Sequence, residues 1–132
     1  MKSKSSELLD KSISAMIAAI EVYNKPDFMY RGETFSILAI NSWELLLKAK
    51  YLKDNHNKMR SLYVMEPVTN KDGSKSKKKK TKLTRSGNPF THSIDFIAKK
   101  LIEKNEMDQV IFNNIMALIE LRDSAIHFYN YS

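Results

Sequence analysis

The sequence predicts an all-α fold: an antiparallel helical bundle of four main helices, with a basic loop or short β-hairpin inserted between the second and third. Three observations lead to this prediction. Apolar residues recur at helical spacing in four segments, breakers such as Pro26 and the run SGNP separate them, and the positive charge is concentrated in one stretch. At 132 residues the chain fits a single domain, 1–132, which can bury a core without disulfides.

The first two helices are predicted at 5–24 and 33–55. Ser5 or Ser6 is placed to cap the first helix, and Pro26 ends it. The second segment is apolar over most of its circumference, so we expect it at the centre of the bundle. The apolar residues at helical spacing in the first helix are Leu9, Ile13, Met16, Ile17 and Ile20.

The basic insert spans 61–90 and precedes the last two helices. Asp72-Gly73 is a turn signal, and the flanks 62–68 and 81–86 have the composition of two short hairpin strands. Pro67 restricts the first strand to an edge position, and we expect the lysine-rich tip to be mobile. The third helix is predicted at 91–105 and the fourth from about Asp108 to Tyr129.

The net charge of +7 comes entirely from residues 71–85 of this insert, which hold eight basic residues against Asp72 alone, because the remainder of the chain is neutral. Lysine side chains give sequence-independent, salt-dependent contacts to phosphates, so we expect the insert to bind RNA. The alternative is a solvated loop tip that only keeps the protein soluble, and no aromatic residue lies within the run to stack on bases. The candidate RNA-binding residues are Lys75, Lys77, Lys78, Lys79, Lys80, Lys82 and Arg85.

Composition argues against several other classes of protein. The chain has no cysteine, and its three histidines show no metal-ligand spacing, so we predict neither a metal site nor a cofactor. No signal peptide is recognisable, and no segment approaches the roughly 20 apolar residues that span a membrane. We therefore expect a cytoplasmic protein without a membrane partner.

Arg122 lies in the middle of the apolar stripe of the fourth predicted helix. At about 100° per residue, with Ile111 as zero, the apolar side chains fall between about −40° and +80° and Arg122 at about +20°. A buried guanidinium without a partner is very unfavourable. Glu44 interrupts the stripe of the second helix in the same way, so we expect these two residues to pair. The pair is either a purely structural ion pair or part of a cleft.

His127 lies at the edge of that stripe, at about 160°. Taken alone, it is typical of a surface residue or of a hydrogen-bond partner for Asp123. Beside an arginine it becomes a candidate acid or base, because its ordinary pKa allows both roles near neutral pH.

The hexad RDSAIH, 122–127, resembles the R-x(4–6)-H motif of the HEPN superfamily, which consists of small all-α domains that include many metal-independent ribonucleases. The run FSILAINSWELLLKAKYL, followed by an insert, SGNP and a helix, is similar to one bacterial HEPN branch catalogued as a domain of unknown function. The resemblance covers about 6–130. Members of that branch usually continue further, so we expect this chain to be a fragment of a longer protein or a short form.

The resemblance implies a function as well as a fold. It assigns Arg122 and His127 to an active site, with Asp123 as the polar residue after the arginine and Glu44 as a supporting residue. It implies a homodimer in which both copies of the hexad line one cleft. The expected activity is that of a metal-independent endoribonuclease, a toxin or phage-defence effector with an antitoxin or defence-system partner. The alternative is a non-catalytic HEPN-like module for RNA binding, nucleotide binding or dimerisation.

Overall fold

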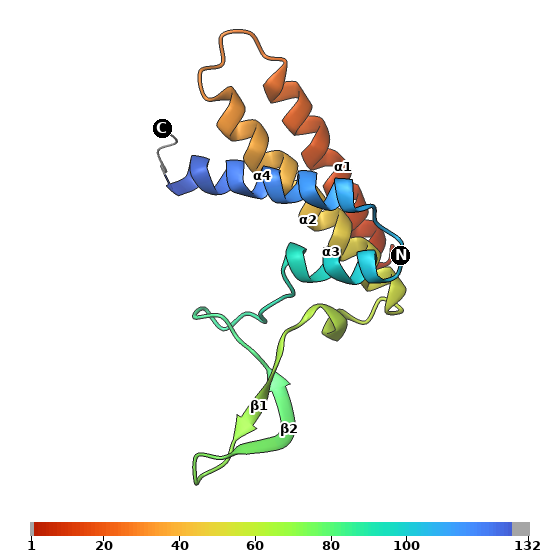
Figure 1. Ribbon diagram of the computed structural model, residues 1–132, viewed down its shortest axis with the longest axis vertical. Helices are drawn as coiled ribbons and strands as arrows, with labels where there is room; N and C mark the ends of the chain where they lie inside the picture. Colours follow the sequence, from red (N-terminus) through yellow and green to blue (C-terminus); the bar gives the residue numbers. More distant parts are fainter. Residues whose placement is uncertain (1, 128–132) are drawn as a thin grey trace.

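Four α-helices, one 3-10 turn and a two-stranded sheet follow one another in the computed structural model, which describes residues 2–127 (Figure 1). The mostly helical fold and the position of the insert agree with the sequence-based prediction. The end predicted for the last helix, Tyr129, lies outside the described residues. The elements are α1 (Lys4–Tyr23), α2 (Arg31–Asp54), η1 (Met59–Leu62), β1 (Met65–Thr69), β2 (Lys75–Thr81), α3 (Ile94–Glu103) and α4 (Gln109–His127).

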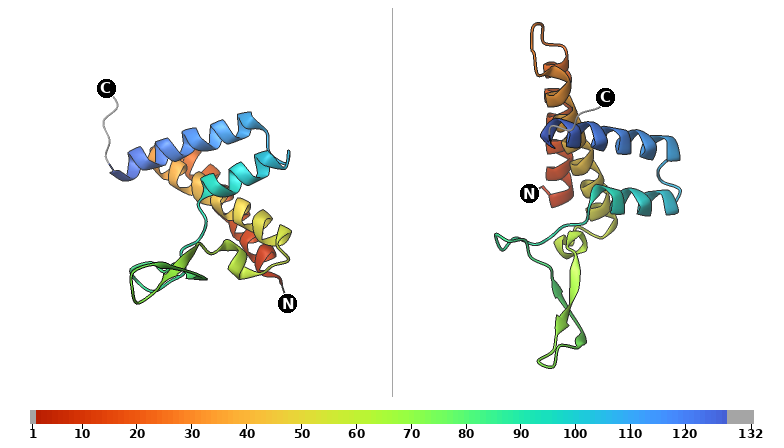
Figure 2. Two further views of the ribbon diagram at one scale, coloured as in Figure 1. Left: turned by 60° about the horizontal axis from the view of Figure 1, so that its bottom comes forward. Right: turned by 60° about the vertical axis from the view of Figure 1, so that its left-hand side comes forward.

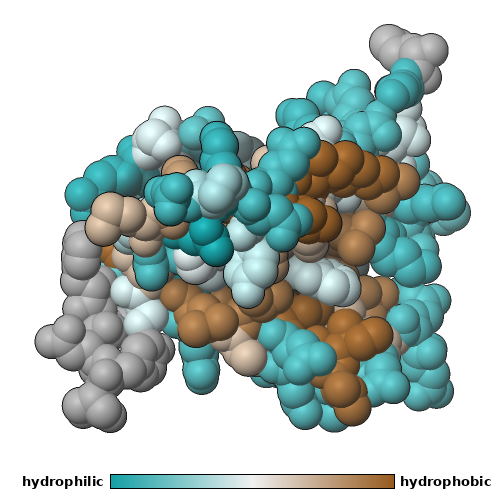
Figure 3. Space-filling model, turned by 90° about the horizontal axis from the view of Figure 1, so that it is seen from above, coloured by the Kyte–Doolittle hydropathy of each residue, from teal (hydrophilic) through white to brown (hydrophobic). Residues whose placement is uncertain are grey.

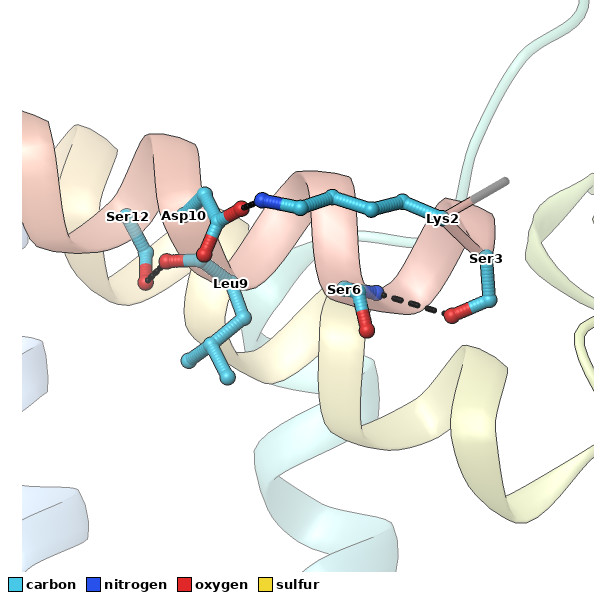
Figure 4. A network of polar contacts seen from close by, with 6 residues as sticks. All are labelled: Lys2, Ser3, Ser6, Leu9, Asp10 and Ser12. Carbon is cyan, nitrogen blue, oxygen red and sulfur yellow. Dashed lines mark hydrogen bonds and ion pairs between the residues drawn. The ribbon is translucent and has the colours of Figure 1, made fainter.

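The N-cap of helix α1 lies two to three residues before the predicted caps. The hydroxyl of Ser3 accepts a hydrogen bond from the backbone N–H of Ser6 at 3.2 Å, so Ser3 is the N-cap (Figure 4). Ser5, one of the predicted caps, is instead buried inside the helix, and its N–H donates to the side-chain oxygen of Asn57 at 2.9 Å. The prediction failed because several neighbouring serines satisfy the same capping rule.

Helices α1 and α2 form an antiparallel pair that packs through small side chains (Figures 1 and 2). The buried residues of α1 are Ser5, Ser12 and Ala19, spaced by seven residues. The hydroxyl of Ser42 on α2 donates to the backbone carbonyl of Ser12 at 2.7 Å. A side chain reaching the backbone of the neighbouring helix requires a close approach, which small residues permit.

Helix α2 is also buried on its opposite side. Ser42 lies about 200° around the helix from Ile40, which is fully buried in the main hydrophobic core. This core joins α2 with η1, α3 and α4 through Ile40, Leu47, Leu52, Leu62, Ile97, Ala98, Leu101 and Ile115. The prediction that the second helix lies at the centre is therefore confirmed.

Helices α3 and α4 run across α2 on the side away from α1 (Figures 1 and 2). Among the described residues neither of them comes into backbone proximity with α1. The arrangement therefore differs from four helices lying side by side in an antiparallel bundle. The physical reason is that α2 separates α1 from the other two helices.

The large apolar residues of α1 remain half exposed. Because α1 packs through its serines and alanine, its isoleucines lie beside the contact with α2 rather than in it, and their exposed fractions are 51% for Ile13, 52% for Ile17 and 50% for Ile20. Leu121 on α4 is 56% exposed. Figure 3 shows hydrophobic side chains gathered in patches on the face of the molecule seen from above. Exposed apolar surface of this extent is typical of an interaction surface.

The insert forms the predicted β-hairpin, but its strands differ from those expected. Strand β1 pairs antiparallel with β2, with Met65 opposite Thr81 and Pro67 opposite Lys79. The lysine run itself is therefore strand β2 and not the mobile tip, and most of 81–86 lies beyond the strand. Pro67 is tolerated because both strands of a two-stranded sheet are edge strands. The turn contains Gly73, whose φ of +88° favours glycine.

The neck of the insert is closed where its two ends meet the helices. The N–H of His92 donates to the carbonyl of Leu62 at 2.8 Å, and Tyr63 and Thr91 form an antiparallel bridge. The hairpin projects from this neck, away from the helices (Figure 1). Within residues 2–127 no helix has the length and apolar character needed to cross a membrane.

We predict that Ala19→Leu lowers the free energy of unfolding by about 1–3 kcal/mol, because the added side chain forces α1 away from α2. Urea unfolding followed by circular dichroism measures the change. The control is Ser14→Leu, which adds the same side chain at an exposed position of α1 and should stay within about 0.5 kcal/mol. Equal effects of the two substitutions would contradict the close α1–α2 contact.

Candidate active site and nucleic-acid interface

Arg122 lies on α4 and forms its ion pair with the next residue. Its Nε and Nη2 donate to Oδ1 of Asp123 at 3.2 and 3.0 Å. The side chain of Arg122 is 28% exposed and that of Asp123 is 42% exposed. The guanidinium is thus half-buried, with a carboxylate that holds its orientation and with donor groups still available to an anion.

The predicted ion pair between Glu44 and Arg122 does not form. Glu44 pairs instead with Lys48, one turn later on α2, at 3.0 Å, and Lys48 also donates to the hydroxyl of Thr91 at 3.1 Å. Both charges thus find partners on their own helices, at positions where little ordering is needed. Glu44 therefore helps to join α2 to the end of the insert and does not orient the hexad.

His127 is exposed at the end of the described part of α4. It lies five residues after Arg122, so the two side chains leave the helix about 140° apart. Because of this divergence, a single copy of the hexad does not direct its two functional groups at one phosphate.

A cleft of about 530 Å³ opens between α4 and the α1–α2 end of the molecule. Tyr23, Phe35, Leu121 and Ala125 contribute apolar surface to it. Neither Arg122 nor His127 lines this cleft. Within one chain the hexad therefore borders an apolar surface without forming an enclosed catalytic pocket.

The seven candidate RNA-binding residues all lie on the hairpin or on the segment that follows it, and all are exposed. Successive side chains of a strand point to opposite faces, so the lysines of β2 project from both faces of the hairpin. Lys80 lies 4.0 Å from Glu66 on the paired strand. In the described part of the chain no carboxylate lies within ion-pair distance of the other five lysines. The hairpin is thus an exposed arm whose positive charge is largely uncompensated.

An aromatic cluster that the sequence analysis missed lies where the insert joins the helices. The ring of His92 stacks on Phe96 at 4.1 Å between centroids, and Tyr51 meets both rings edge-on. The ammonium of Lys100 lies 5.5 Å from the centre of the Phe96 ring. The pKa of His92 is lowered because burial disfavours the imidazolium, with a further contribution from the charge of Lys100. The only signal in the sequence for this stack is that His92 and Phe96 are four residues apart at the start of α3.

The structure does not bring the two predicted sites together within one chain. Arg122 and His127 lie towards the end of α4 at the side of the helical body, whereas the hairpin projects from the opposite side of the neck (Figures 1 and 2). Residues 2–127 hold no group of three or more histidine, aspartate or glutamate side chains arranged to bind a metal ion.

We predict that protonation of His92 lowers the free energy of unfolding as the pH falls from about 7 to 5. The unfolded chain takes up this proton near the ordinary pKa of 6.5, whereas the folded protein takes it up only at lower pH, so protonation favours unfolding. An NMR titration of the imidazole checks the pKa directly. Lys100→Met should raise the pKa of His92, whereas Lys99→Met, on the neighbouring position, is the control. A pKa of His92 at or above 6.5 would contradict this environment.

The comparisons with known proteins give one match. The model of the family described as Domain of unknown function (DUF3644) matches residues 7–132, which is nearly the whole chain. No curated protein and no solved structure shows significant similarity to this chain. The matched segment includes most of α1 and the whole of α2, the hairpin, α3 and the hexad on α4. The chain therefore belongs to the DUF3644 family.

Proposed function

We propose that this protein is a metal-independent endoribonuclease of HEPN type, acting in the cytoplasm as a toxin or phage-defence effector. The observation that carries the proposal is the placement of the hexad. Arg122 is half-buried with its guanidinium oriented by Asp123, and His127 lies exposed one and a half turns later on the last described helix. An oriented cation and an accessible imidazole are two of the groups that metal-free RNA cleavage uses.

The reaction uses the 2′-hydroxyl of the RNA as the nucleophile. His127 accepts the proton of this hydroxyl as its oxygen attacks the adjacent phosphorus. The bond from phosphorus to the 5′-oxygen then breaks, and that oxygen takes a proton from an imidazolium or from water. The products are a 2′,3′-cyclic phosphate and a 5′-hydroxyl. Arg122 stabilises the additional negative charge on the phosphorane oxygens, for which a planar guanidinium is well suited.

Two features of the chain favour a homodimer as the active form. The first is the divergence of Arg122 and His127, which a second chain overcomes if His127 of one protomer faces Arg122 of the partner subunit. The second is the half-exposed apolar surface of α1 and α4, which a partner would cover. For such a toxin or defence effector we also propose an antitoxin or a defence-system partner.

A second candidate function is a non-catalytic RNA-binding module. The exposed and largely uncompensated lysines of β2 favour this function independently of the hexad. In the enzyme, the same hairpin serves to attract the substrate. The two functions differ in whether RNA is cut or only bound.

We predict that the protein cleaves single-stranded RNA in the presence of EDTA and that His127→Ala slows cleavage by at least about 100-fold, the range for loss of a general acid or base. Arg122→Ala should cause a similar loss. Denaturing gels and phosphatase sensitivity identify the cyclic phosphate ends, and an all-2′-O-methyl RNA is the uncleavable control. Cleavage that continues unchanged in both variants would overturn the assignment, whereas salt-sensitive binding without cleavage would favour the binding module.

We also predict that mixing the Arg122→Ala and His127→Ala proteins restores about a quarter of the wild-type activity. In a two-fold dimer with composite sites, half of the dimers are mixed, and each of these has one intact and one doubly altered site. The measurement requires subunit exchange, which is checked with two differently tagged chains. If exchange occurs and the mixture remains inactive, both catalytic residues come from one chain.

A further inference from the structure

Phe90 is fixed at the base of the lysine hairpin by backbone hydrogen bonds. Its N–H donates to the carbonyl of Lys82 at 2.7 Å, and its carbonyl accepts from the N–H of Val64 at 2.7 Å. The N–H of Lys82 donates in turn to the carbonyl of Val64 at 2.8 Å. Three chain segments therefore meet in a closed triangle of hydrogen bonds, which holds the Phe90 backbone in a fixed position relative to β2.

The loop between Lys82 and Phe90 strengthens this arrangement. Leu83 and Pro89 form an antiparallel bridge, and the N–H of Thr84 donates to the carbonyl of Asn88 at 2.7 Å. The turn at the tip contains Gly87, with a φ of +88°. Residues 82–90 are therefore a second, shorter hairpin that folds Phe90 back beside the end of the lysine strand. An aromatic residue that lies outside the lysine run in the sequence lies next to it in the fold.

The ring of Phe90 is exposed although burial would stabilise the protein. Of the five phenylalanines in residues 2–127 it alone is exposed, with an exposed fraction of 42%. The ammonium of Lys82 lies 4.7 Å from the ring centroid and covers part of it. Phe90 also lies outside the main hydrophobic core and the apolar residues packed against it. The fold thus presents an exposed aromatic ring on a hydrogen-bonded backbone, with a cation beside it.

Exposed aromatic rings next to a cationic strand have a known physical use. A phenylalanine ring stacks on an unpaired base of any type, while neighbouring lysines contact the phosphates. A base in a duplex is not available for such stacking, because it is already stacked and paired. Lys82 lies beside the ring and at the end of the run of β2 lysines, so its ammonium is placed to contact a phosphate next to the stacked base.

We propose that Phe90 is a stacking platform for a base of single-stranded RNA whose phosphates follow the lysines of β2. The choice of RNA rests on the proposed function, of which this site is the substrate-binding part. The platform gives the hairpin a preference for unpaired strands, which lysines alone do not provide.

The test measures RNA binding in the His127→Ala background, so that no probe is cut. The probe is a fluorescein-labelled oligouridine of twelve nucleotides, and anisotropy gives the dissociation constant over a range of KCl concentrations. Phe90→Ala should weaken binding by at least about five-fold, as expected for loss of one stacked base, with an unchanged salt dependence. Lys79→Ala should instead reduce the slope of log K against log salt by about 0.7.

Two variants serve as matched controls. Leu83→Ala removes a similar amount of apolar surface from the same short hairpin, where Leu83 is 55% exposed, and should change the affinity by less than about two-fold. Phe90→Trp keeps an aromatic ring and should retain or improve binding. A duplex RNA of equal length should bind Phe90→Ala and the parent protein equally, and the corresponding deoxyuridine strand shows whether the 2′-hydroxyl contributes.

The outcomes separate this proposal from the proposed function. If Phe90→Ala and Leu83→Ala behave alike, or if the loss is equal for duplex and single strand, the stacking site is wrong even when wild-type protein cleaves RNA. Failure of every form to bind the oligouridine also overturns it. If binding depends on Phe90 but wild-type protein cuts no RNA, the stacking site stands and the nuclease assignment fails.

Discussion

The fold depends on the burial of α2 from two opposite sides. One side meets α1 through serine and alanine, and the hydroxyl of Ser42 reaches the backbone of Ser12. The other side carries Ile40 and Leu47 into the core with α3 and α4. Because one helix serves both contacts, a displacement of α2 would disturb every other helix. The hexad and the hairpin are both attached, through α4 and the neck, to this central element.

The packing of α2 on α1 through small side chains also explains why so much apolar surface remains exposed on α1. A close contact through small residues leaves the isoleucines of α1 beside the interface, since they are too large to lie within it. A monomer gains nothing from keeping such a stripe in water. The stripe and the divergent geometry of Arg122 and His127 are independent observations, and the proposed second chain would account for both.

Much of the secondary structure could be predicted from the sequence, because the periodicity of apolar residues is a local property. The four helices lie within a few residues of their predicted positions. The pairing of charges could not be predicted in this way. Glu44 and Arg122 each interrupt an apolar stripe, but whether they meet depends on how the helices cross, and both found partners closer in sequence.

In the insert, too, the observed structure depends on contacts between segments that are distant in the sequence. Lysine has a low preference for β-strands, so the run 77–80 alone does not indicate a strand; its pairing with Met65–Thr69 imposes one. The position of Phe90 was equally hidden, because the second short hairpin that returns it to Lys82 depends on long-range backbone hydrogen bonds. The hexad could be recognised because its residues are consecutive on one helix.

The closed neck has a consequence for how this protein can vary. Since Leu62 and His92 are hydrogen-bonded neighbours, the thirty or so residues between them enter and leave the helical body at one point. A change in the length or charge of the hairpin would therefore leave the eight buried residues of the main core in place, because all of them lie outside this segment. In the proposed nuclease, the part that attracts RNA and the part that cuts it could then change independently during evolution.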